Sequence, residues 1–178
     1  MSVDYRFTIK RKADDKKLGT FYYNRIKSLY DIYATDLKFD PENISSNEES
    51  PTKFTSNDIA NDINLLKMKI ASDYSKIFEK KLLIPQAANK DIKDDIEADI
   101  YTIEEEIKDL MYALEALSGL YGAITAIVED LVRDGSNDPE NESSMAYIYN
   151  AEGLPNTAEG YSPSIWVDDV YIEVLACY

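Results

Sequence analysis

The sequence predicts an α+β fold in which a long antiparallel helical hairpin and one further helix stand on a small antiparallel sheet formed by the N- and C-terminal segments. Both chain ends alternate apolar and polar residues, as half-buried strands do. Two middle segments instead repeat apolar residues at three- and four-residue steps, the spacing of a coiled-coil seam. The members of these two ladders are Ile59, Ile63, Leu66, Ile70 and Ile77, then Ile96, Ile100, Ile103, Ile107, Leu110, Leu114 and Leu117.

The N-terminal segment begins with a predicted strand. Tyr5, Phe7 and Ile9 alternate with polar residues, so one face of this strand can be buried while the other stays in water. From Leu18 the apolar spacing becomes helical and stays so to about Leu37, and we expect the first helix there.

Residues 39–55 are expected to form a flexible loop. The segment is rich in Pro, Asn, Ser and Glu and has few apolar residues. Such a composition offers little apolar surface with which to offset the entropy cost of ordering the chain.

The first helix of the hairpin has a clear start and a clear end. Thr55 can cap its N-terminus, and Asp58 stands at the third helical position of a capping box. The helix should run to about Leu82. Pro85 cannot continue the ladder and disfavours helix at the residue before it, so residues 83–89 should form the connector.

The second helix of the hairpin is longer than the first. It should run from near Lys90 to near Asp134, about 65 Å against about 40 Å for the first at 1.5 Å per residue. Folding about the connector leaves residues 118–133 beyond the hairpin. The helix predicted over 18–37 and the sheet should bury them there. A stripe of small residues within 110–128 would let another backbone approach closely: Ala116, Gly119, Ala123 and Ala126.

Residues 110–128 carry one charged side chain, Glu115, and so invite comparison with a membrane span. Polar residues such as Ser118 and Thr125, and acidic flanks with hardly a basic anchor, argue against a span. We therefore expect a buried core helix and no membrane association.

The C-terminal quarter should return to the sheet. An acidic turn is expected over 134–142, a short strand over 146–149 and a Gly/Pro-rich loop over 153–163. From Trp166 the residues alternate again to the chain end, which predicts a strand pairing with the N-terminal one.

The chain should fold as a single domain, 1–178, because its 178 residues and 44% hydrophobic content can fill one core. Residues 1–38 and 134–178 should form the body, 39–55 a loop and 56–133 the hairpin.

The residue inventory excludes several chemistries. The chain has no histidine and a single cysteine, Cys177, so it lacks the residues for zinc sites, disulfides and Ser-His or Cys-His catalysis. We expect no cofactor, no metal and no enzymatic activity.

Two acidic motifs fail as metal sites. The loop 134–145 starts with the rhythm of a calcium loop, but Pro139 replaces the turn glycine and Met145 replaces the bidentate glutamate. Asp168 and Asp169 are adjacent on a predicted strand and should point to opposite faces.

The net charge of −15 is unevenly distributed. Residues 1–38 hold nine Lys/Arg against five Asp/Glu, and no basic residue follows Arg133. A field of this sign repels phosphates, so we do not expect direct binding to nucleic acid.

The connector is the candidate partner-binding site. It places an apolar cluster at the far end of a charged stalk, where the core of the domain cannot reach it, and exposed apolar tips commonly mark docking surfaces. The candidate residues are Leu82, Leu83, Ile84, Pro85, Ala87 and Ala88.

The predicted function is non-enzymatic protein–protein interaction, as a structural or accessory part of a larger homo- or hetero-oligomeric assembly. Residues 1–12 lack the apolar run of a secretory signal, so we expect a cytoplasmic protein. The small, acidic, Asn/Lys/Asp/Tyr-rich chain suggests a bacteriophage particle as the setting. The alternative is an acidic mimic of nucleic acid that inhibits a basic nuclease or host-defence protein.

Overall fold

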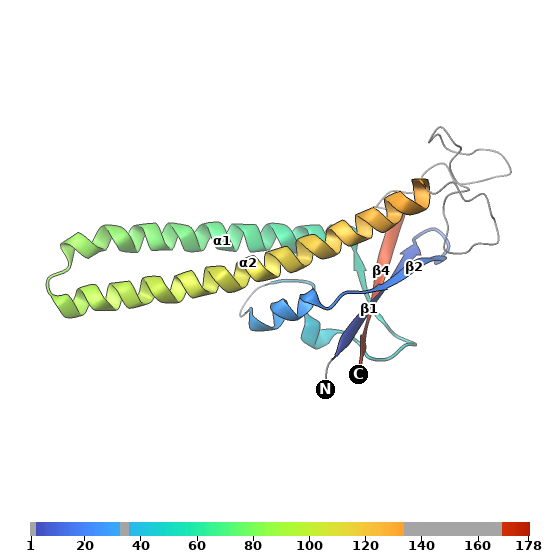
Figure 1. Ribbon diagram of the computed structural model, residues 1–178, viewed down its shortest axis with the longest axis horizontal. Coiled ribbons are helices and arrows are strands. Elements are labelled where there is room, and N and C mark those ends of the chain that lie inside the picture. Colours follow the sequence, from blue (N-terminus) through green and yellow to red (C-terminus); the bar gives the residue numbers. More distant parts are fainter. Residues whose placement is uncertain (1–2, 33–35, 134–168) are drawn as a thin grey trace.

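The structure, a computed structural model, describes residues 3–32, 36–133 and 169–178. Within them it contains two α-helices and a four-stranded antiparallel sheet, which confirms the α+β class. The helices α1 (Ser56–Leu83) and α2 (Lys90–Arg133) lie side by side in opposite directions and project away from the sheet (Figure 1).

The strands of the sheet stand in the order β2-β1-β4-β3. The central pair is β1 (Asp4–Arg11) and β4 (Val170–Cys177), which run antiparallel along their whole length. The predicted pairing of the two chain ends is therefore confirmed. The edges are β2 (Lys17–Tyr22), which pairs with β1, and β3 (Thr52–Thr55), which pairs with β4.

The predicted helix from Leu18 is wrong over its first residues, because they form β2. Residues 12–16 turn the chain back onto β1, with Asp15 at a positive φ of 58°. In the resulting register Phe21 lies opposite Phe7, and the two rings stack at 5.3 Å between centroids. Helical character begins only at η1, a 3-10 helix over Arg25–Asp31, and residues 36–38 are not helical. The predicted further helix to about Leu37 is therefore wrong in its bounds at both ends, and its described part is a short 3-10 helix.

The predicted loop 39–55 is also wrong, since this segment contributes to the core. It contains a 3-10 helix, η2 (Pro41–Asn43), and then β3. Phe39 and Phe54 are buried with their ring centroids 4.6 Å apart, and Ile44 is buried beside them. A few well-spaced apolar side chains thus outweigh the polar composition of the segment.

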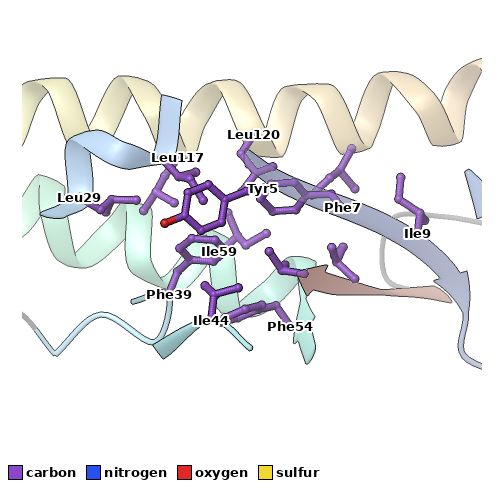
Figure 2. Packing of buried hydrophobic residues seen from close by; sticks show 14 of the residues in the cluster. Tyr5, Phe7, Ile9, Leu29, Phe39, Ile44, Phe54, Ile59, Leu117 and Leu120 are labelled. Atoms are coloured by element: carbon purple, nitrogen blue, oxygen red, sulfur yellow. The ribbon is translucent and has the colours of Figure 1, made fainter. Parts of the chain in front are cut away.

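The core of the body lies between β1 and the two helices. Figure 2 shows Tyr5 and Phe7 of β1 with Leu117 and Leu120 of α2 on one side and Ile59 of α1 on the other. All five side chains are fully buried.

The part of α2 beyond the hairpin is buried in the same cluster through Leu120, Ile124 and Val128. The predicted burial of this half is confirmed. Instead of another backbone, the phenol of Tyr23 fills the space at the small residues: it donates a 2.7 Å hydrogen bond to the Ala116 carbonyl and occupies the space where a side chain at Gly119 would lie.

The capping box at the start of α1 is confirmed. Thr55 Oγ1 accepts from the Asp58 N–H at 3.1 Å, and the Asp58 carboxylate accepts from the Thr55 N–H at 2.9 Å. One turn later the buried Asp62 accepts hydrogen bonds from the backbone N–H groups of Lys38 and Phe39 at 2.9 and 2.8 Å. Burial raises the pKa of Asp62. Asp62 therefore attaches the segment around Phe39 to α1.

Among the described helices, α2 alone contains a window long and apolar enough to cross a membrane by length and composition. The same helix supplies Leu117, Leu120 and Ile124 to the core, and the core helix of a globular protein gives such a signal.

Several sequence predictions lie outside the described residues. These are the acidic turn 134–142, the strand 146–149, the loop 153–163 and the start of the final strand at Trp166.

Candidate docking site

The hairpin tip is a short, locally hydrogen-bonded turn. After α1, a 3-10 turn, η3 (Ile84–Gln86), is closed by a 3.2 Å hydrogen bond from the Ala87 N–H to the Ile84 carbonyl. The side chain of Asn89 then accepts from the Ile92 N–H at 2.9 Å and caps the start of α2. Local bonds therefore fix the path of the backbone at the tip without help from the body.

The six predicted tip residues divide into two groups. Leu82 and Leu83 are 56% and 49% exposed, and Pro85 and Ala88 are exposed too. The others, Ile84 and Ala87, are half-buried.

Ile84 packs against the distal cluster, which we define as the buried residues Ile77, Ile100 and Ile107. Ile84 therefore anchors the tip, whereas the two leucines face solvent.

Sequence reasoning missed an extension of this apolar surface. Phe78, one turn before Leu82, is 65% exposed, and Tyr74 one turn earlier is exposed as well. These three side chains stand four residues apart and so share one face of α1. The spacing of four, on a face beside the ladder, was the signal available in the sequence. On α2, Ile92 adds a further exposed apolar side chain near the tip.

Basic groups lie beside this apolar surface on α1. Lys80 and Lys81 occupy its last turn, where positive charge is favourable at a helix C-terminus. Lys80 Nζ reaches Asp99 of α2 at 3.2 Å, so it also links the two helices near the tip.

A second unexpected feature is a carboxylate inside the seam between the helices. Asp73 is fully buried on the side of α1 that faces α2. Lys69 Nζ and Lys76 Nζ lie 3.3 and 3.6 Å from its Oδ1, but neither Asp73 oxygen accepts a hydrogen bond from any described residue. A buried carboxylate in this state opposes tight closure of the seam.

Glu106 of α2 faces Asp73 and shares Lys69 with it, at 3.6 Å from Nζ. Protonation would let Glu106 donate a hydrogen bond to Asp73. That interaction, with burial as a smaller contribution, raises the pKa of Glu106. The stability of the middle of the hairpin should therefore depend on pH through this pair.

The structure brings together no metal-binding group of three or more acidic or Cys side chains within the described ranges. Cys177 is half-buried at the end of β4, with Sγ 4.0 Å from the Leu175 carbonyl oxygen.

The geometry defines an α+β protein with a projecting helical hairpin and an apolar tip. Comparisons of the chain with protein-family models, with curated proteins and with solved structures find no match.

Proposed function

We propose that this protein is a non-enzymatic interaction protein that docks through the hairpin tip onto a protein partner, as a structural or accessory part of a larger assembly. The observation that supports this proposal is the exposure of Leu82 and Leu83 at the end of the hairpin farthest from the sheet. Full burial of a leucine side chain stabilises by about 1.5–3 kcal/mol. Covering both leucines would therefore contribute substantially to binding.

The proposal includes coiled-coil packing of the stalk. The apolar ladders of α1 and α2 meet in the seam, with Ile77, Ile100 and Ile107 buried against one another. Such a seam holds two helices rigid with few residues, which suits a stalk that presents its tip at a distance from the body.

The setting we propose is a homo- or hetero-oligomeric assembly in a cytoplasm, such as a bacteriophage particle. The small, acidic, Asn/Lys/Asp/Tyr-rich chain supports this choice.

The alternative function, inhibition by mimicry of nucleic-acid charge, is supported by a different surface. Glu104, Glu105 and Asp109 are exposed on α2, and none of them takes part in an ion pair within the described residues. Binding through these carboxylates should weaken steeply with salt. Glu104→Lys with Glu105→Lys should abolish it, whereas docking through the tip should persist.

Site-specific photo-crosslinking in the producing cell tests docking at the tip. A photoreactive residue replaces Leu83 in one variant and the exposed polar Ser75 of α1 in a matched control. We expect one discrete crosslinked protein from position 83 and none from position 75. Adding Leu82→Asp to the first variant should remove that product. Equal crosslinking at both positions, or a product that survives Leu82→Asp, would contradict the proposal.

A further inference from the structure

We propose that two copies of this chain associate through the outer face of α2, in an antiparallel arrangement with two-fold symmetry. We define the outer face by Tyr101, Lys108, Met111, Glu115 and Gly122. These positions recur at steps of three, four and seven residues, so they lie in one stripe along the helix. The occupant of this face is therefore a second α2.

The outer face is the side of α2 that the rest of the described chain leaves open. Tyr101 and Met111 are 64% and 47% exposed. A Cβ at Gly122 would meet no atom of another described element within 4 Å, whereas Gly119 on the body side is in close contact with Tyr23. The stripe is thus exposed, whereas the body-facing side of the same helix is packed.

The apolar part of this surface continues onto α1. A groove of about 480 Å³ runs beside the seam and is lined by Tyr74, Ile107, Met111 and Tyr112, with three charged residues, Glu104, Lys108 and Glu115, in its walls. Such a groove gives the side chains of an opposing helix a place to insert.

Two opposite charges of the outer face, Lys108 and Glu115, can pair across a two-fold axis. The point midway between them along the helix falls between Met111 and Tyr112. An antiparallel second copy centred there brings Lys108 beside the partner's Glu115, and the symmetry forms the same pair again.

The shape of the outer face follows the same symmetry. Tyr101 and Gly122 also lie equally far from the midpoint, so the exposed ring of Tyr101 meets the open space above the partner's Gly122. Met111 meets the partner's Met111 near the axis. An unrelated partner would not require charge and shape to mirror each other about one point, and this self-complementarity is the reason for choosing a second copy.

This dimer does not depend on docking at the tip. The arrangement places the two tips at opposite ends of the pair, so one dimer would present two docking surfaces.

Sedimentation equilibrium of the full chain at physiological salt, up to high micromolar concentration, tests the dimer. The wild type should dimerise reversibly. Lys108→Glu and Glu115→Lys should each weaken association at least tenfold, because each places like charges together twice. The double variant restores both pairs with reversed sign and keeps the net charge, so it should recover the wild-type association. Lys67→Glu, an equal charge change at an exposed position of α1, should have little effect.

Two results would overturn the dimer: a wild-type protein that stays monomeric over the whole range, or a double variant as weak as the single ones. The second result would point to self-association in which Lys108 and Glu115 do not pair.

Disulfide trapping tests the register independently. In a Cys177→Ser background, Met111→Cys near the two-fold axis should oxidise to a covalent dimer, since a disulfide needs Cα atoms within about 7 Å. Ser72→Cys, exposed on α1, is the control and should remain a monomer. Equal trapping at both positions would contradict the proposed register.

Discussion

The body and the distal half of the hairpin bury apolar side chains on very different scales. The body packs one large cluster from the sheet, η1 and both helices, with aromatic residues such as Phe7 and Phe39 in contact at its centre. The distal half rests on the small distal cluster, Ile77, Ile100 and Ile107, and includes a buried carboxylate, Asp73.

The distal half also leaves its large apolar residues outside. Phe78, Leu82, Leu83 and Tyr101 are exposed there, although they would stabilise the hairpin if they were turned inward. The difference indicates that the body supplies most of the stability of the fold, which agrees with our proposal that the hairpin supplies surface for contact.

The largest effect should come from the centre of the body. Phe7→Ala removes a fully buried ring that contacts Phe21, Tyr23 and Phe39. We expect the free energy of unfolding to fall by about 3–5 kcal/mol, as for other buried Phe→Ala changes. Denaturant unfolding followed by circular dichroism measures this loss. A loss below that of an exposed-site change such as Tyr22→Ala would mean that the body is not the stabilising part.

The next effect should have the opposite sign and lie in the hairpin. Asp73→Leu replaces a buried carboxylate that lacks hydrogen bonds with an apolar residue of the same branched shape, while Lys69 and Lys76 are partly exposed and can turn to water. We expect a gain of about 1–3 kcal/mol in unfolding free energy. Asp73→Asn removes the charge but keeps a buried polar group, so its gain should be smaller. A loss with Asp73→Leu would show that the lysine ion pairs outweigh the burial cost.

A smaller, pH-dependent effect should come from Glu106. Its pKa is raised in the folded protein, so the folded state binds this proton more tightly than the unfolded chain, and stability from this group increases as pH falls. Glu106→Gln removes the charge at every pH. The variant should therefore have a higher melting temperature than the wild type at pH 7, and this difference in melting temperature should shrink as pH falls through the raised pKa. Melting curves across this pH range test the prediction. A difference that grows in acid would contradict it.

The parts of the fold that could be predicted from the sequence were those coded by local pattern. The capping box at Thr55, the break at Pro85 and the alternation through Tyr5 and Phe7 each depend on a few neighbouring residues. They located both helices and the central strand pair.

The parts that could not be predicted depend on partners distant in the sequence. The spacing around Leu18 and Phe21 suits a helix as well as a strand, and pairing with β1 decides between them. Residues 39–55 look like a loop by composition, yet Phe39 and Phe54 meet each other in the core.

The candidate site could be predicted only in part, because some of it also depends on contacts between residues distant in the sequence. The apolar tip follows from the position of the connector, but the inward turn of Ile84 depends on the distal cluster. The buried Asp73 left a trace in the sequence, because the first ladder steps directly from Ile70 to Ile77 and Asp73 occupies the position between them. Its burial and its contact with Glu106 needed the three-dimensional pairing of the helices.

We propose that the hairpin tip makes contacts which the fold does not need. The most direct test is the native mass of the complex isolated with a tagged chain, measured for the wild type and for Leu82→Asp with Leu83→Asp, alongside the unfolding free energy of each purified protein. We expect the double variant to lose the larger complex while its stability changes by less than about 1 kcal/mol, as for exposed sites. An unchanged complex mass, or a loss of stability that accounts for the loss of the complex, would contradict the account.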